Sequence, residues 1–296
     1  MEIAHLLALG AALSWTLAGL FGHAPVLALG SLHFNRIRMV VASLWLVPMI
    51  IIAGDPASIQ ISSLGAILVS SLIGVVLGDY FLFLAMSRLG PRLTGILFAM
   101  NAPIAALLGW LILEEKLSWQ TIAALLIGVS GVILAVLYGK RRDISHIWEQ
   151  IKPPIWIGIG AGILAAIGQA AGVLILRPVM SAGADPWTAS LIRVLFAALC
   201  LWVIYPFDKK AHSLPILVKG RLGWLILANG FFGLSFGVAL MLKALETGIV
   251  AEVTLLASVS PVMVLPFIWW QTKKSPPFGA WLGALLVVIS SWLLIP

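Results

Sequence analysis

Charged residues and cysteine are both scarce in this chain of 296 residues. Only 10% of the residues are Asp, Glu, Lys or Arg, whereas soluble domains carry about a quarter. The single cysteine, Cys200, excludes a disulfide-bonded secreted scaffold. The shortage of polar residues also excludes a disordered chain, which would need a largely polar composition.

Hydrophobic residues make up 61% of the chain, and they occur in long runs. A helix needs roughly 20 mostly apolar residues to cross a bilayer. Ten such runs are present, at 3–22, 34–53, 64–86, 91–112, 119–138, 155–176, 187–206, 222–243, 249–270 and 278–295. The short alternating segments of a membrane β-barrel are not seen. The sequence therefore predicts an all-α integral membrane protein with ten transmembrane helices in contact with the lipid bilayer.

The excess of basic residues, 18 Lys and Arg against 11 Asp and Glu, indicates an orientation in the membrane. Alternate loops place twelve basic residues on one face and three on the other, and three more lie within the runs. Cytoplasmic loops are enriched in Lys and Arg. We therefore expect both termini to be extracytoplasmic, and we expect no nucleic-acid partner, because topology accounts for the basic charge.

The two halves of the chain carry matching residues in the same order. The matched pairs are Arg38 with Arg193, Gly74 with Gly233, Gly78 with Gly237 and Pro103 with Pro261, separated by 155 to 159 residues. Because each copy holds an odd number of runs, the second copy would be inverted in the membrane, as in many secondary transporters. We predict five-helix repeats at 1–138 and 155–296. The connector 139–154 is predicted to be an interfacial helix, with a solvated linker as the alternative.

Several motifs recur in one order along the chain. They are the arginine of residues 36–40, repeated in residues 191–195; Ala85-Met86-Ser87-Arg88-Leu89-Gly90, with Pro103 after it; and Leu113-Glu114-Glu115-Lys116-Leu117, followed by Gly128 and Gly131. In this order the chain resembles the drug/metabolite transporter superfamily, in its EamA-like branch. The resemblance implies a bacterial inner-membrane exporter of small metabolites, often amino acids, with a central cavity formed by both halves.

The chain departs from this family pattern in two ways. The second copy has Gln271-Thr272-Lys273-Lys274 where the first has Leu113-Glu114-Glu115-Lys116, which weakens any general role for the glutamate. The resemblance also implies cytoplasmic termini, whereas the distribution of basic residues predicts the opposite, and we follow that distribution.

Four charged residues lie well inside the predicted spans, where charge is costly and commonly functional. They are Arg38, Asp79, Arg193 and Glu252. Arg36 is closer to a span end, from which its side chain could reach the headgroups. Arg38 and Asp79 lie within about two helical turns of the same membrane face, so they could form a pair there. Arg193 and Glu252 lie about one turn from the opposite face, so a second pair is possible there. Such pairs could gate the pathway, bind a zwitterionic substrate or carry a coupling proton on Asp79 or Glu252. The alternative is that they only fix helix packing.

Uncharged residues complete the candidate site: Ser14, Trp15, Tyr80, Asn101, Gln169 and Asn229. Ser14-Trp15 aligns with Gly168-Gln169 near the middle of the first and sixth runs, where a site between inverted repeats would lie. For the two aromatic residues, simple packing is the alternative. We expect the paired glycines, Gly74, Gly78, Gly233 and Gly237, to permit close helix contact. We expect Pro103 and Pro261 to kink the fourth and ninth spans.

The sequence contains no P-loop, no metal-binding cluster and no nucleophile–base pair at helical spacing. We therefore expect no cofactor, no metal and no enzymatic activity, and we interpret the scattered His5 as an interfacial residue. The sequence does not define the oligomeric state.

The predicted function is secondary active transport of a small-molecule substrate. We expect an exporter of small organic metabolites such as amino acids, which works by alternating access around a midplane cavity. The alternatives are an importer or exchanger of sugar or nucleotide derivatives, and a membrane scaffold that transports nothing. Phosphorylated ligands usually need several basic residues, and only Arg38 and Arg193 qualify.

Overall fold

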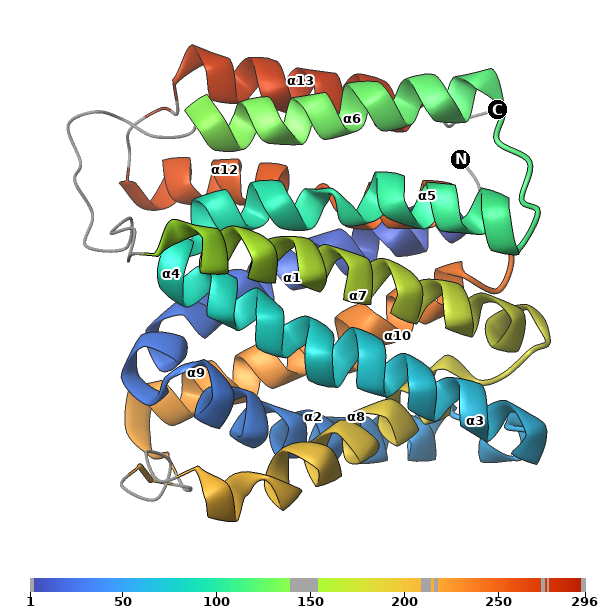
Figure 1. Ribbon diagram of the computed structural model, residues 1–296, viewed down its shortest axis with the longest axis vertical. Helices are drawn as coiled ribbons and strands as arrows, with labels where there is room; N and C mark the ends of the chain where they lie inside the picture. The colour runs from blue at the N-terminus through green and yellow to red at the C-terminus, as the bar shows by residue number, and fades with distance from the viewer. Residues whose placement is uncertain are drawn as a thin grey trace.

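The computed structural model describes residues 3–138, 154–208, 214–215, 218–272, 275 and 277–293, which are almost entirely helical (Figure 1). The first half contains α1 (Ile3–Leu29), α2 (Ser31–Ala53), α3 (Ile61–Ser70), α4 (Gly78–Ala99), α5 (Asn101–Ile112) and α6 (Trp119–Tyr138). The second half contains α7 (Ile155–Ser181), α8 (Pro186–Val203), α9 (Gly220–Gly230), α10 (Gly237–Ala244), α11 (Val250–Ala257), α12 (Ser260–Thr272) and α13 (Phe278–Leu293). The interfacial helix predicted for the connector falls on residues 139–153, outside the described residues.

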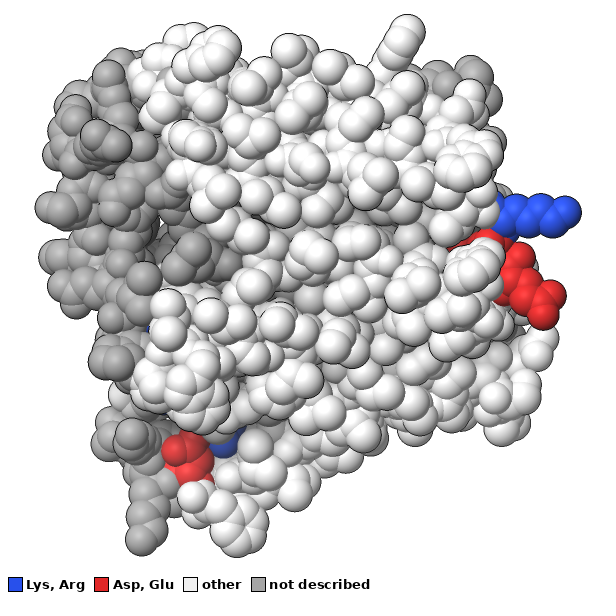
Figure 2. Space-filling view, turned by 45° about the horizontal axis from the view of Figure 1, so that its top comes forward, with Lys and Arg blue, Asp and Glu red and all other residues white. Residues whose placement is uncertain are grey.

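Seven helical stretches are long and apolar enough to cross a membrane. They are Ile3–Gly22, Ser31–Ala53, Ile61–Leu89, Thr94–Ile112, Ile155–Ser181, Pro186–Phe207 and Gly220–Ala244. Shorter apolar helices cover the fifth and tenth predicted runs, and α11 with α12 covers the ninth. Figure 2 shows a broad uncharged surface, with the visible charged side chains near its edges. The chain is thus a multi-pass, all-helical membrane protein in its described residues, and the count of ten spans stays a prediction.

Equivalent helices of the two halves run in opposite directions and lie side by side. α1 begins at one end of the molecule, where α13 ends, and α7 begins at the other end, where α6 ends (Figure 1). We call these the terminal end and the connector end. Among the equivalent pairs, α2 packs against α8 and α6 against α13, and α5 of the first half also packs against α11 of the second. Each half therefore shares its core with the other.

The third and eighth runs are each interrupted by a wider π-helical segment. η2 (Ser71–Leu77) joins α3 to α4, and η6 (Phe231–Phe236) joins α9 to α10. The two segments occupy equivalent places, since each contains the first paired glycine and ends next to the second. A π-helical turn weakens the regular backbone ladder, so its carbonyl groups become acceptors for side chains of neighbouring helices.

The fourth and ninth runs are broken at equivalent places near the middle. A turn at Met100 separates α4 from α5, and a turn at Ser258 and Val259 separates α11 from α12. Pro103 and Pro261 each follow the first residue of the turn by three positions. Since proline has no N–H, the carbonyls of Ala99 and Ala257 lose their usual helical donors. The interruptions thus coincide with the predicted kinks.

Candidate functional site

A small cavity lies between the two halves, at the breaks in the fourth and ninth runs. Helices α1, α4, α5, α7, α10, α11 and α12 all contribute to its wall. Three of the predicted residues line it, namely Trp15, Asn101 and Gln169. Its other polar side chains are hydroxyl groups, and no charged side chain of the described residues lines it. The cavity therefore offers hydrogen bonds and apolar contact, without a fixed counter-charge.

Asn101 connects the two helix breaks beside this cavity. Its Nδ2 donates to the carbonyl of Phe98 at 2.6 Å, and its Oδ1 lies 3.2 Å from the hydroxyl of Ser258. The same hydroxyl is 2.7 Å from the carbonyl of Thr254, so its one proton is shared between two acceptors. Asn101 and Ser258 belong to different halves, so this contact crosses the boundary between them.

The polar residues in the middle of α1 bind the backbone of η6. Ser14 Oγ donates to the carbonyl of Phe232 at 2.7 Å, and Trp15 Nε1 donates to that of Gly233 at 2.9 Å. These bonds fix the indole ring at the cavity wall. Gln169 occupies the equivalent position in α7, but its side chain makes no hydrogen bond within the described residues. Its amide is available to a ligand in the cavity.

Asn229 lies in a contact between the halves and does not line the cavity. Its Nδ2 donates to the carbonyl of Ala18 at 2.7 Å. The equivalent residue of the first half, Ser70, donates to the carbonyl of Gly172, also at 2.7 Å. Ala18 and Gly172 are themselves equivalent positions in α1 and α7. Asn229 therefore anchors α9 to α1.

The paired glycines lie where helices of different halves approach closely. A Cβ atom on Gly74 would be 3.2 Å from the Cα of Gly172, and one on Gly78 would be 3.8 Å from the backbone N of Gln169. In the other contact, a Cβ on Gly237 would lie 2.8 Å from Nε1 of Trp15. For Gly233 the nearest atom would be the Cβ of Ala18, at 3.3 Å. Gly74 and Gly237 thus leave no room for a side chain without a shift.

Arg38 and Asp79 form an ion pair in which Arg38 Nη2 donates to Asp79 Oδ2. Their side chains are 8% and 17% exposed, and the Arg38 guanidinium lies 4.8 Å from the centre of the Phe83 ring. Arg193 also interacts electrostatically with Asp79, and its Nη2 approaches Gly74. One carboxylate therefore faces two buried arginines, which leaves this group with a net positive charge.

The predicted Arg193–Glu252 pair is wrong. Arg193 faces Asp79, whereas Glu252 is bound by His5 and Thr121. The helices explain the difference, since α8 packs against α2 and η2 while α11 packs against α1 and α5. Matching depth along two runs is necessary for a pair, but it does not make the two helices neighbours.

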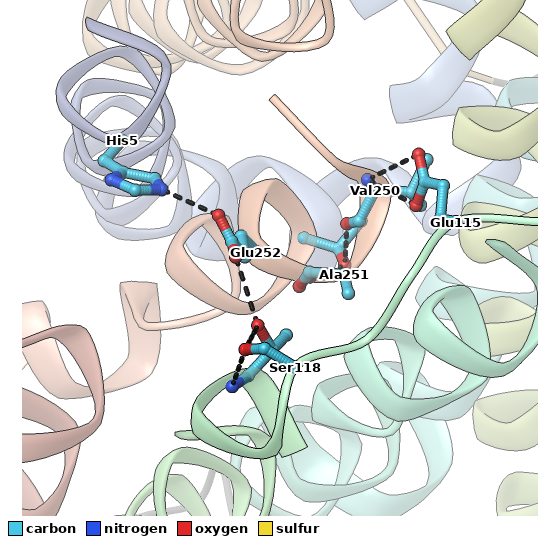
Figure 3. Close-up of polar contacts among 8 residues, drawn as sticks. His5, Glu115, Ser118, Val250, Ala251 and Glu252 are labelled. Atoms are coloured by element: carbon cyan, nitrogen blue, oxygen red, sulfur yellow. Dashed lines mark hydrogen bonds and ion pairs between the residues drawn. The ribbon is translucent and has the colours of Figure 1, made fainter. Parts of the chain in front are cut away.

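Glu252 lies near the terminal end, where it binds residues of the first half (Figure 3). Its Oε2 is 2.9 Å from His5 Nε2, and its Oε1 accepts a hydrogen bond from Thr121 Oγ1 at 3.1 Å. His5 is only 3% exposed, so its interpretation as an interfacial residue is wrong. The scattered position of His5 in the sequence gave no sign of this contact, because its partner is 247 residues away.

Glu115 makes the converse contact, from the first half to the second (Figure 3). Its carboxylate accepts the backbone N–H of Val250 at 3.0 and 3.2 Å and lies 3.5 Å from Arg177 Nε. Burial raises the pKa of Glu115, and the Val250 N–H and Arg177 oppose this effect. The sequence motif around Glu115 was visible, but its role was missed because one partner is a backbone group and the other lies in the second repeat.

Two other predicted residues lie elsewhere. Arg36 does not reach the headgroup region, because its side chain is fully buried. Its Nε donates to the carbonyl of Leu201 at 2.9 Å, and its Nη1 is 2.8 Å from Asp208 Oδ2. Tyr80 is 38% exposed and packs edge-on against Phe81 outside the cavity.

The sequence model of the EamA-like transporter family matches the chain twice, at residues 2–137 and 156–295. The chain therefore belongs to this family, and the resemblance to drug/metabolite transporters is confirmed. A protein of known crystal structure has the same fold, with a TM-score of 0.80 over 99% of this chain and 96% of that one, at 15% identity. The chain is also similar to the S-adenosylmethionine/S-adenosylhomocysteine transporter of Chlamydia trachomatis serovar L2. The two are 23% identical over 145 residues, which cover 49% of this chain and 42% of that relative.

Proposed function

We propose that this membrane transporter is a secondary active exporter of small organic metabolites such as amino acids. It works by alternating access around the cavity between two inverted five-helix repeats, 1–138 and 155–296. The position of the cavity carries the proposal, because it lies between the halves at the paired helix breaks. Broken helices at a repeat interface present backbone polar groups to a substrate, and the two halves can rock around such a site.

The lining of the cavity limits the substrates that it can accept. A phosphate or a dicarboxylate would be desolvated there without a charged partner, at a high cost in free energy. A small molecule that is neutral or zwitterionic fits better, because it can use the free amide of Gln169 and the hydroxyl groups around Asn101. We assign Arg38, Asp79 and Arg193 to the contact between the moving halves, with Asp79 or Glu252 as carrier of a coupling proton.

A second candidate function is exchange of a nucleoside derivative. The observation that favours it is the similarity to a transporter of S-adenosylmethionine and S-adenosylhomocysteine. Neither compound contains phosphate, so neither needs the several basic residues that the cavity lining lacks. Counterflow with labelled amino acids and labelled S-adenosylmethionine in one preparation of proteoliposomes separates the two candidates.

Counterflow also tests the cavity itself, through Gln169→Leu. Loss of one hydrogen bond to the substrate is expected to lower transport at subsaturating substrate by about tenfold. Detergent melting should change little, since the Gln169 amide has no partner to lose within the described residues. Gln120→Leu is the matched control, because Gln120 is exposed on α6. Equal transport by both variants would place the substrate elsewhere.

We also propose an inner-membrane orientation with both termini extracytoplasmic, on the strength of the twelve-to-three distribution of basic residues. A reporter fused after Pro296 is expected to be active outside the cytoplasm, and one inserted in the connector inside it. The opposite pattern would show that the orientation implied by the family resemblance prevails over the charge distribution.

A further inference from the structure

Two carboxylates at the terminal end bind the opposite halves in a reciprocal manner. Glu115 extends from the turn between α5 and α6 and binds Val250 and Arg177 of the second half. Glu252 extends from α11 and binds His5 and Thr121 of the first half. Arg177 Nη1 also donates to the carbonyl of Leu245 at 2.9 Å, which fixes the chain just before α11. The links made by Glu115 and Glu252 join the two halves, so they must change if the halves separate at this end.

The helix held by these contacts leads directly to the cavity. α11 has only eight residues, with a turn before it and the proline-associated break after it. Its first turn carries Glu252 itself and the Val250 N–H that Glu115 binds, and Thr254 and Ala257 further along it line the cavity. Within it, Thr254 Oγ1 donates to the carbonyl of Val250 at 2.6 Å, so a residue that lines the cavity is bonded to the first residue of α11. A movement of α11 at the terminal end therefore changes the cavity wall.

The sequence of the repeats shows that this arrangement belongs to one end only. The position equivalent to Glu252 in the first half is Thr94, and the one equivalent to Glu115 in the second half is Lys273. The acidic residues therefore have no acidic counterparts at the connector end, although the fold is duplicated.

We propose that Glu115 and Glu252 form a latch that closes the cavity toward the terminal end. The inference rests on the proposed transport function and assigns a gate to it.

The latch is expected to respond to pH, because its closed state buries the carboxyl group of Glu115. Its carboxyl faces Arg177 of α7 and Glu252 of α11, and Glu252 in turn faces His5 of α1. Burial in the closed latch raises the pKa of Glu115 above its ordinary value, to which the pKa would return in an open, hydrated state. The closed state therefore binds the proton more tightly than the open one. Acid favours the closed latch, and this stabilisation is lost as pH rises through the raised pKa.

The latch can be tested by cavity access, independently of transport. The reporter is Gly95→Cys in a Cys200→Ser background, because Gly95 lines the cavity and a Cβ there would meet no atom within 4 Å. A second variant, Ser181→Cys in the same background, serves as the reference, because Ser181 is exposed at the end of α7. A membrane-impermeant maleimide is added from the side of the membrane on which this reference reacts. Reporter rates are divided by the reference rates at each pH, which removes the pH dependence of thiol reactivity.

Glu115→Ala and Glu252→Ala are each expected to raise the normalised labelling rate by about tenfold, because each removes at least one hydrogen bond of the closed state. Glu114→Ala is the matched control, since Glu114 is the exposed neighbour on the same turn, and it should leave the rate unchanged. Rates within twofold of the parent in both latch variants would overturn the latch, whether or not the protein transports. Labelling that changes as expected without any measurable flux would leave the latch standing and contradict the transport function.

Glu115→Gln tests the proton separately. Its side chain mimics the protonated carboxyl and retains an acceptor for the Val250 N–H, so the fold should be kept. We expect slow labelling at every pH, whereas labelling of the parent should accelerate as pH rises above the ordinary carboxyl range. A pH dependence that survives in Glu115→Gln would overturn the role of this proton.

Discussion

Asp79→Ala is expected to abolish transport and to lower the free energy of unfolding by about 3–5 kcal/mol, the usual cost of breaking a buried ion pair. The variant leaves Arg38 and Arg193 buried without the carboxylate that both face. Detergent melting and proteoliposome flux measure the two effects. Asp55→Ala is the matched control, because Asp55 is exposed in the loop between α2 and α3 and should change neither quantity.

A double-mutant cycle separates the ion pair from other effects of the substitution. Arg38→Asp combined with Asp79→Arg remakes the pair with reversed polarity, so part of the lost stability should return. Transport need not return, since Arg193 then faces a like charge. Additive stability effects, together with normal flux in both single variants, would show that the pair has neither an energetic nor a gating role.

Gly172→Ala is expected to lower the free energy of unfolding by about 3 kcal/mol, the upper end of the usual cost of overpacking, because the contact is with backbone. The added Cβ would lie 2.9 Å from the Cα of Gly74 and 3.3 Å from the carbonyl oxygen of Ser70. Neither atom can move without shifting a whole helix. Transport should fall in parallel, since this contact joins the two halves next to η2.

Gly160→Ala provides the control within the same helix. A Cβ on Gly160 would meet nothing within 4 Å, so the change should stabilise α7 by up to about 1 kcal/mol, through the better helix propensity of alanine. The two variants should therefore shift the melting temperature in opposite directions. Equal destabilisation would mean that close contact at Gly172 does not limit the packing of α7.

Helix positions could be predicted from the sequence because the signal is local. A run of apolar residues contains the information needed to place a helix in a membrane, and helices occupy the described parts of all the predicted runs. The interruptions were only partly visible. Pro103 and Pro261 marked the breaks in the fourth and ninth runs, whereas no residue type marks a π-helical segment such as η2, which depends on contacts with other helices.

Contacts between residues far apart in the sequence were predicted only for charged residues, because opposite charge and similar depth in the membrane left few possible partners. Depth along the spans indicated that Arg38 could meet Asp79, and the structure brings them together. The same reasoning failed for Arg193 and Glu252, because it contains no information on which helices are neighbours. Glu115 was missed for a further reason. Its hydrogen-bond partner is the backbone N–H of Val250, a group that every residue except proline provides.

The hydrogen bonds beside η2 and η6 end on the carbonyls of Gly172 and Ala18. Both acceptors are backbone groups, so the two hydrogen bonds depend on side-chain chemistry only at their donors, Ser70 and Asn229. One half can therefore use Ser70 and the other Asn229 without separating the halves. The equivalence of the two halves is for this reason better preserved in the path of the backbone than in the identity of the residues.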